Sequence, residues 1–200
     1  MSYGNVLAVI PCRRDSKRFP HKSTALFQGV PLVQNTILTA KEAGIWIILV
    51  TTDDVNVITI AASEEVHYLN RPEDLCTDDA RMEAVVENAV HYAMYAVDGP
   101  HWTFHTVCLM QVTSPLLGFV SLQIALDKYF ETKATSLTAV NLLYEPVGAF
   151  YIVDRERFMK NKSFYQEGGG VYILPAGQCI DVDHPHQLQI AKLVDAGRVA

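Results

Sequence analysis

The sequence predicts an α/β protein of three layers, with helices on both faces of a mostly parallel, mixed sheet. Short apolar runs rich in β-branched residues alternate with longer segments whose apolar residues recur at helical spacing. The 200 residues suit one domain, and the 50% that are hydrophobic suffice for one core. Repeats, low-complexity segments and linkers are absent from the sequence, so residues 1–200 are expected to form a single domain.

The first elements are marked by their borders. Asn5–Ile10 is an apolar run between Gly4 and Pro11, which predicts a buried strand. Residues 31–44 begin with proline, end with glycine and carry apolar residues at helical spacing, which predicts a helix. A β-rich run at 45–51 predicts the second strand. Asp53 or Asp54 is then expected to cap a helix that ends near Glu64.

The remaining elements follow the same alternation. A stripe of apolar residues from Met82 to Met94 predicts a helix over 79–97, which Asp98-Gly99-Pro100 ends. Further strands are expected at 66–70, 103–110, 135–143, 148–153 and 170–176. Further helices are expected at 119–130 and 185–196.

Three polar loops follow predicted strands. They are 11–23 (PCRRDSKRFPHKS), 51–54 (TTDD) and 111–115 (QVTSP). Ligands of parallel α/β sheets lie beyond the carboxyl ends of the strands, so these loops are expected to converge on one edge. The QVTSP loop offers an amide and two hydroxyls, which suit either a bound polar ligand or a helix cap.

The loop at 11–23 is unusually basic for an acidic protein. The chain has 16 Lys and Arg against 22 Asp and Glu, a net charge of −6, which argues against general nucleic-acid binding. Within ten residues of this loop, five cations surround the single acid Asp15: Arg13, Arg14, Lys17, Arg18 and Lys22. The glycine-rich phosphate loops GxxxxGK[ST] and GxGxxG are absent. The placement favours phosphate binding through Arg and Lys side chains, and the alternative is a solvated charged loop.

A pair of carboxylates near the end of the chain predicts a metal site. Asp181 and Asp183 would share one face of an extended segment, and Mg²⁺ prefers one or two carboxylates plus phosphate oxygens. Two alternatives stay open: the aspartates cap the following helix, or His184 and His186 join them around Zn²⁺.

Other patterns bear on the cell compartment. The cysteines stand singly, without a CxxC pair, which fits a reduced cytoplasm. Apolar runs have strand length only, below the ~18 residues of a membrane span, and the first residues do not resemble a secretory signal. We therefore expect a cytoplasmic protein that binds neither membrane nor nucleic acid.

Five motifs in order resemble those of the CMP-sialic acid synthetases (acylneuraminate cytidylyltransferases). The family reads IPARxGSKRxPxKN, STDD, RPxxLAxDxA, LLQPTSPLR and IDIDTxEDLxxA. This chain reads IPCRRDSKRFPHKS, TTDD, RPEDLCTDDA, LMQVTSPLL and IDVDHPHQLQIA. The resemblance implies a nucleotidyltransferase fold and the transfer of CMP from CTP to an acidic, sialic-acid-like sugar, with release of pyrophosphate. It also implies a role in nucleotide-sugar and cell-surface polysaccharide biosynthesis.

The resemblance also implies the site residues. Arg13 and Lys22 would stabilise charge on the phosphoryl group. CTP would be held by Arg13, Ser16, Lys17, Lys22, Ser23 and Arg71. The sugar acid would face Gln111, Thr113 and Ser114. Asp181 and Asp183 would hold Mg²⁺, with Mn²⁺ as the alternative. No residue is distinguished as the general base.

Departures from the family pattern keep other functions open. Asp15 stands where a small neutral residue is usual, Ser23 where the family has Asn, and Leu117 where it has Arg. A family segment of a few tens of residues, which contributes sugar contacts and a dimer arm, is reduced to 142–147. We therefore expect an open sugar side, a less extensive homodimer, and a mobile flap at 164–170 (FYQEGGG). The alternatives are a weak or inactive nucleotide-binding relative, and a nucleotidyltransferase with another acceptor or base.

Overall fold

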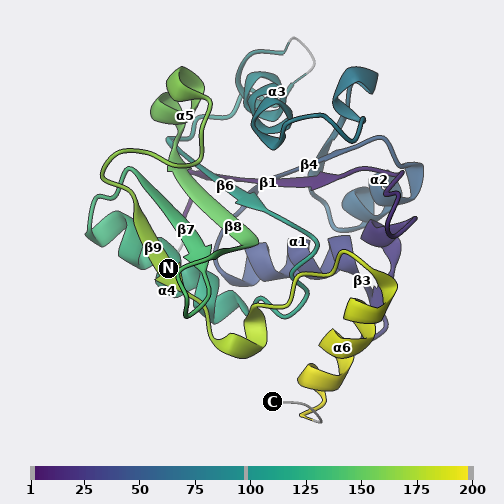
Figure 1. Cartoon of the computed structure of the whole chain (residues 1–200). Helices are drawn as coiled ribbons and strands as arrows, with labels where there is room; N and C mark the ends of the chain where they lie inside the picture. Colours follow the sequence, from purple (N-terminus) through teal and green to yellow (C-terminus); the bar gives the residue numbers. More distant parts are fainter. Residues whose placement is uncertain (1–2, 97–98, 198–200) are drawn as a thin grey trace.

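One mixed, mostly parallel sheet lies between two layers of helices, which confirms the predicted fold class (Figure 1). The computed structural model describes residues 3–96 and 99–197, and in these residues seven strands form the sheet. Their order is β5 (His67–Asn70), β4 (Ile47–Thr52), β1 (Val6–Cys12), β6 (Thr106–Met110), β8 (Pro146–Asp154), β7 (Ser136–Val140) and β9 (Gly170–Ile173). Only β8 runs antiparallel to its two neighbours.

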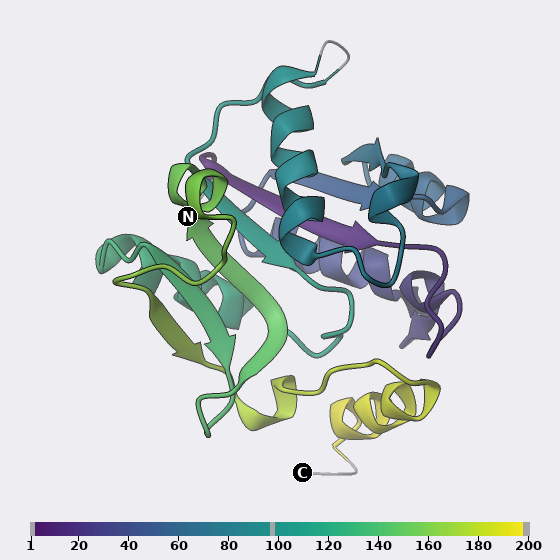
Figure 2. The ribbon, with the colours of Figure 1, turned by 45° about the horizontal axis from the view of Figure 1, so that its top comes forward.

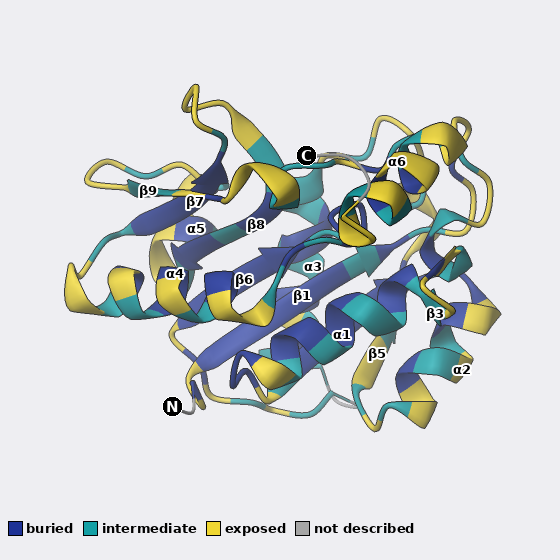
Figure 3. Ribbon diagram, turned by 90° about the horizontal axis from the view of Figure 1, so that it is seen from below, coloured by how far each residue is buried: buried dark blue, intermediate teal, exposed yellow. Residues whose placement is uncertain are grey.

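The helices divide between the two faces of the sheet. One layer comprises α1 (Leu32–Glu42), α2 (Val55–Ser63), α4 (Phe119–Glu131) and α6 (Pro185–Asp195). The other comprises α3 (Met82–Tyr95) and α5 (Arg155–Asn161) (Figure 2). Alternate residues of β1 enter the two cores: Ala8 packs with the first layer, whereas Leu7 and Val9 pack with the second. The central strands are buried on both faces, while the outer helix surfaces are exposed (Figure 3).

Strand β1 is the point at which the order of the sheet reverses. It pairs in parallel with β4 on one side and with β6 on the other. A crevice opens at such a point beyond the carboxyl ends of the strands. The basic loop leaves β1 at this edge, and the polar loops after β4 and β6 follow the neighbouring strands.

Several element boundaries differ from the predictions. Helix α3 begins at Met82 rather than at residue 79, and Val97, its predicted end, lies outside the described residues. Strand β6 begins at Thr106, three residues later than predicted. Strand β9 ends at Ile173, because Pro175 opens a 3₁₀ helix, η3 (Ala176–Gln178). The short helix α5 was not predicted; Asp154 caps it by accepting a hydrogen bond from the Arg157 amide.

A tight hairpin joins β7 to β8. Strand β7 ends at Val140, because the side chain of Asn141 accepts hydrogen bonds from the amides of Leu143 and Glu145 and turns the chain. Strand β8 then begins at Pro146, two residues before the predicted start. The connection is thus shorter than the six residues expected from the sequence.

Smaller features complete the fold. A 3₁₀ turn, η1 (Lys22–Thr24), ends the basic loop and leads into a small hairpin of β2 (Leu26–Phe27) and β3 (Val30–Pro31). A further 3₁₀ turn, η2 (Glu73–Leu75), follows β5. Among the described residues, no helix combines the length and the apolar character that a membrane crossing requires.

Candidate functional site

The basic loop is held by the aspartates of the TTDD motif. The amide of Arg14 donates a hydrogen bond of 2.7 Å to Asp53 Oδ1. The neighbouring Asp54 accepts from the Asn56 amide and caps α2, which decides between the two predicted caps. Asp53 therefore ties the loop after β1 to the loop after β4.

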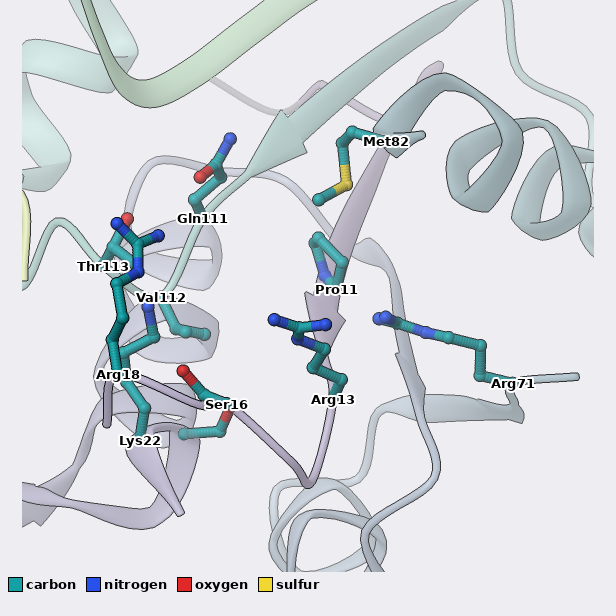
Figure 4. A pocket seen from close by; sticks show the side chains of 11 residues that line it. Pro11, Arg13, Ser16, Arg18, Lys22, Arg71, Met82, Gln111, Val112 and Thr113 are labelled. Carbon is teal, nitrogen blue, oxygen red and sulfur yellow. The ribbon is translucent and has the colours of Figure 1, made fainter. Parts of the chain in front are cut away.

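A cavity of about 140 Å³ lies beside this loop, at the carboxyl ends of β1 and β6 (Figure 4). Four of its lining residues are cationic and come from two segments of the chain: Arg13, Arg18, Lys22 and Arg71. The loop after β6 supplies the opposite wall. The full lining is Pro11, Arg13, Ser16, Arg18, Lys22, Ser23, Arg71, Met82, Gln111, Val112 and Thr113. The predicted convergence of loops on one edge is therefore present in the geometry.

Arg71 is the most buried of these cations, with 8% of its surface exposed. Its guanidinium donates to the Thr51 carbonyl at 2.7 Å, and its amide bonds to the Thr52 carbonyl. Burial lowers the pKa of Arg71 from its usual value against the opposing effects of Cys12, Cys76 and Asp53, and the positive charge of Arg13 adds a smaller lowering. The cavity is thus a site where cations face one another, and an anion would relieve their repulsion.

Two other cations reach the second aspartate of the IDVD motif. Lys22 Nζ lies 2.9 Å from Asp183 Oδ1, and Arg18 Nη2 lies 2.8 Å from Asp183 Oδ2. Burial alone would raise the pKa of Asp183, but the hydrogen bond from Lys22 and the charges of Lys22 and Arg18 lower it overall. These ion pairs join the C-terminal segment to the basic loop.

Asp181 differs from Asp183 in its electrostatic setting. Its pKa is raised, first by partial desolvation and then by the charge of Asp183, against the nearby Thr113 hydroxyl and the charge of Lys22. The backbone holds the two segments together, since the Val182 amide donates to the Thr113 carbonyl at 2.7 Å. The pair of aspartates therefore lies at the margin of the cavity.

The oxygen atoms at this margin of the cavity are of the chemical type that binds Mg²⁺. Two carboxylates interact across one residue. Beside them Thr113 Oγ1 is buried and makes no hydrogen bond of good geometry within the described structure. Mg²⁺ takes one or two carboxylates and fills its other positions with water and phosphate oxygens.

The two alternatives for the aspartate pair find no support. The N-cap residue of α6 is His184 rather than either aspartate. The Gln187 side chain accepts hydrogen bonds from the amides of Asp183 and His184. The rings of His184 and His186 stack on each other at 5.5 Å. In the part of the chain that the structure describes, no group of three or more His, Cys, Asp or Glu is arranged to hold a metal ion, as zinc would require.

Two predicted site residues, Lys17 and Ser114, lie outside the cavity wall, and Asp15 pairs with Arg14, one of the two partners that the sequence offers it. The side chain of Lys17 is 85% exposed, lies outside the lining of the cavity and pairs with Asp78. Ser114 is buried but is absent from the cavity wall. Asp15 is 80% exposed and pairs with Arg14 at 3.5 Å, so its charge is turned to solvent rather than toward the cavity.

A second cavity of about 180 Å³ continues from the first and shares Met82 and Gln111 with it. Its other lining residues are Glu83, Leu109, Tyr151, Phe164 and Tyr165. Burial raises the pKa of the Tyr151 hydroxyl, and Tyr165, Asp181 and Glu83 raise it further, so this phenol stays protonated. Of these residues, the sequence singled out only Phe164 and Tyr165, as part of the expected flap at 164–170. The available signal for Tyr151 was its position in the GAFYIV strand.

The 164–170 segment borders the second cavity and is anchored. Phe164 is buried against Phe158, and the Gln166 amide donates to Ser136 Oγ at 3.2 Å. Thr135 Oγ1 donates to the Glu167 carbonyl. A Cβ at Gly169 would lie 2.4 Å from Ser136 Oγ, so glycine here permits close packing. The expected mobile flap would have to break these contacts.

Cations gathered at the reversal point of a mostly parallel sheet, next to paired carboxylates, define a nucleotidyltransferase. The family model for cytidylyltransferases matches residues 7–163, and the chain belongs to this family. The match covers the basic loop, Arg71 and Gln111.

The chain is similar to two curated bacterial proteins over most of its length. It is 24% identical to the pseudaminic acid cytidylyltransferase of Campylobacter jejuni, with 94% of this chain and 95% of that protein covered. It is 28% identical to the CMP-N,N'-diacetyllegionaminic acid synthase of Legionella pneumophila, with 90% and 91% covered. The first alignment extends over 224 positions, more than the 200 residues of this chain, so part of that relative has no counterpart here.

A solved structure shares the fold. CMP:2-keto-3-deoxy-manno-octonic acid synthetase, complexed with CTP, superposes with a TM-score of 0.72 at 15% identity, covering 97% of this chain and 99% of that one. At this identity the likeness concerns the arrangement of the sheet and helices.

Proposed function

We propose that this protein transfers CMP from CTP to a hydroxyl of an acidic, nonulosonate-like sugar and releases pyrophosphate. The observation that carries the proposal is the single cavity in which Arg13, Arg18, Lys22 and Arg71 meet beside Asp181 and Asp183. The names of the two curated relatives, and the CTP in the related solved structure, support the same nucleotide and acceptor class. Four free thiols favour a cytoplasmic location as part of the proposal.

The nucleotide phosphates would occupy the cationic cavity. Arg13 and Lys22 are proposed as the groups that stabilise charge on the α-phosphoryl oxygens. Ser16, Ser23 and Arg71, which line the same cavity, are proposed to hold the rest of the nucleotide. Lys17, which does not line the cavity, would contribute to nucleotide binding from outside its wall. Preorganised donors of this kind supply most of the catalysis of phosphoryl transfer, in which the protein forms no covalent bond to the phosphoryl group.

The acceptor would lie on the side of Gln111, which lines both cavities. The oxygen of a sugar hydroxyl would form a bond to the α-phosphorus and release its proton to solvent, while the bond from that phosphorus to the bridging oxygen breaks and pyrophosphate leaves with the electron pair. Gln111 and Thr113 would orient the acceptor, and Tyr151 would donate a hydrogen bond from its protonated phenol. Ser114, behind the wall, would support the loop instead.

Asp181 and Asp183 would hold Mg²⁺, or Mn²⁺ in its place. When bound, such an ion neutralises phosphate charge and favours the departure of pyrophosphate. In the chain itself, Lys22 and Arg18 keep Asp183 ionised, and Thr113 favours the ionised form of Asp181.

CTP with Mg²⁺ is expected to stabilise the protein more than ATP, GTP or UTP with Mg²⁺. At a concentration 100-fold above its dissociation constant, a ligand stabilises the folded state by about 2.7 kcal/mol. Thermal unfolding with each nucleotide measures the difference, and pyrophosphate release across a panel of sugar acids then tests the acceptor. Equal shifts for all four nucleotides would remove the cytidine assignment. A CTP shift without turnover on any acceptor would leave a binding protein.

We further expect that the protein does not form a tight dimer by exchange of an arm. The hairpin between β7 and β8 has room for neither a helix nor a long strand, and its tip exposes Leu142, Leu143 and Tyr144. Light scattering should show a mass that is unchanged when Leu142 and Leu143 are both replaced by serine. A tight dimer that this double substitution dissociates would contradict the expectation.

A further inference from the structure

The basic loop has little means of holding its own shape. Between β1 and η1 it forms no helix or strand. It carries five cations against the single acid Asp15, so its own charges repel one another. What holds the loop are three aspartates from three other segments: Asp53 after β4, Asp78 before α3, and Asp183 before α6.

Asp78, like Asp183, binds two loop cations four residues apart. Its Oδ1 lies 2.6 Å from Arg13 Nη2, and its Oδ2 lies 2.5 Å from Lys17 Nζ. Both carboxylate oxygens are therefore occupied. The hydrogen bonds from Lys17 and Arg13 lower the pKa of Asp78, so it is ionised at neutral pH.

The contact leaves Arg13 free to bind a second anion. A guanidinium has five N–H donors in a rigid plane, and one nitrogen on Asp78 leaves the other donors for the cavity. Figure 4 shows the guanidinium of Arg13 directed into the space between Arg71 and Gln111. Lys17, on the other oxygen, lies outside the cavity wall. Asp78 thus fixes the base of the loop from its outer side while Arg13 faces inward.

Asp78 also links two parts of the cavity wall. It follows Arg71 by seven residues, in the connection that leads to Met82 at the start of α3, and both of these residues line the cavity. Its ion pairs therefore hold the loop after β1 against the segment after β5.

We propose that Asp78 is a positioning residue for nucleotide binding, which clamps Arg13 and Lys17 so that the Arg13 guanidinium is aimed at the phosphates. The proposal rests on the proposed function for its ligand. It excludes the opposite role, in which Asp78 occupies the phosphate position and competes with the nucleotide. In that case its removal would tighten binding.

Asp78→Asn keeps the size of the side chain and removes its charge. Calorimetry with CTP and Mg²⁺ should show about tenfold weaker binding, the change that about 1.4 kcal/mol of lost orientation produces. Hydrogen exchange of the amides at 13–18 should become faster, because the loop loses one of its three ties. Asp78→Glu, which keeps the charge, should recover most of the affinity. Asp79→Asn removes an adjacent exposed carboxylate without an ion pair in the described structure and should bind CTP as the wild type does.

A double-substitution cycle with Lys17→Met tests the clamp itself. If Asp78 acts through Lys17 and Arg13, its replacement should cost less affinity in the Lys17→Met background than in the wild type. Equal or tighter CTP binding by Asp78→Asn would overturn the proposal, as would unchanged exchange at 13–18. A wild-type protein that fails to bind CTP would instead refute the proposed function.

Discussion

Replacing Asp181 with asparagine should lower the rate of pyrophosphate release about 100-fold or more at saturating CTP and acceptor. Asparagine keeps the shape but removes the charge that would hold Mg²⁺, and a bound metal ion contributes several kcal/mol of charge stabilisation in the transition state. Since ~1.4 kcal/mol is tenfold in rate, about 3 kcal/mol accounts for the loss. The rate should be measured against Mg²⁺ concentration, together with the Mg²⁺ dependence of the thermal shift that CTP produces.

The same residue sets an acid limit. Because partial desolvation and Asp183 raise the pKa of Asp181, its carboxylate takes up a proton at a higher pH than an ordinary aspartate. As the pH is lowered, Mg²⁺-dependent stabilisation by CTP should therefore be lost at a pH higher than that at which an ordinary aspartate becomes protonated. Asp195→Asn, near the end of α6, removes a carboxylate whose hydrogen bond within residues 3–96 and 99–197 comes from Gln28, and it should leave the rate unchanged. Wild-type Mg²⁺ dependence in Asp181→Asn would place the metal elsewhere.

Lys22→Ala should weaken CTP binding by roughly 10- to 150-fold. Lys22 lines the cavity with only 15% of its side chain exposed, and hydrogen bonds to charged groups contribute about 1.5–3 kcal/mol. About 1.4 kcal/mol corresponds to tenfold in affinity. The variant also leaves Asp183 with Arg18 as its one remaining ion-pair partner in the described structure, so the pKa of Asp183 should rise toward its usual value.

Calorimetry with CTP checks this effect, and Lys41→Ala serves as the matched control. Lys41 also ends in an ion pair, with Glu64 at the end of α2, but does not line the cavity. Its loss should lower stability slightly without changing CTP affinity. Arg13→Ala should weaken CTP binding by a similar factor to Lys22→Ala. If both cavity variants bind CTP as the wild type does, the nucleotide lies elsewhere.

The sequence by itself determined the fold class and the edge of the sheet at which the candidate site lies. Alternation of apolar strands with helical stripes is a local property, so β1, β4 and α1 are visible in it. The position of the basic loop after the first buried strand placed Arg13 and Lys22 at that edge. The aspartate pair was visible as well, because its two carboxylates stand two residues apart.

Only the tertiary structure decided which charges meet. Asp183 reaches Lys22 across 161 positions of sequence, and Asp78 reaches Arg13 across 65, so neither pairing leaves a local pattern. The burial of Arg71 and the turning of Lys17 away from the cavity depend likewise on how the loops pack. Helix α5 escaped prediction because it is short and its cap, Asp154, lies at the end of a strand. The spacing of apolar residues indicates which face of one segment is buried, whereas a site is built from side chains that distant segments bring together.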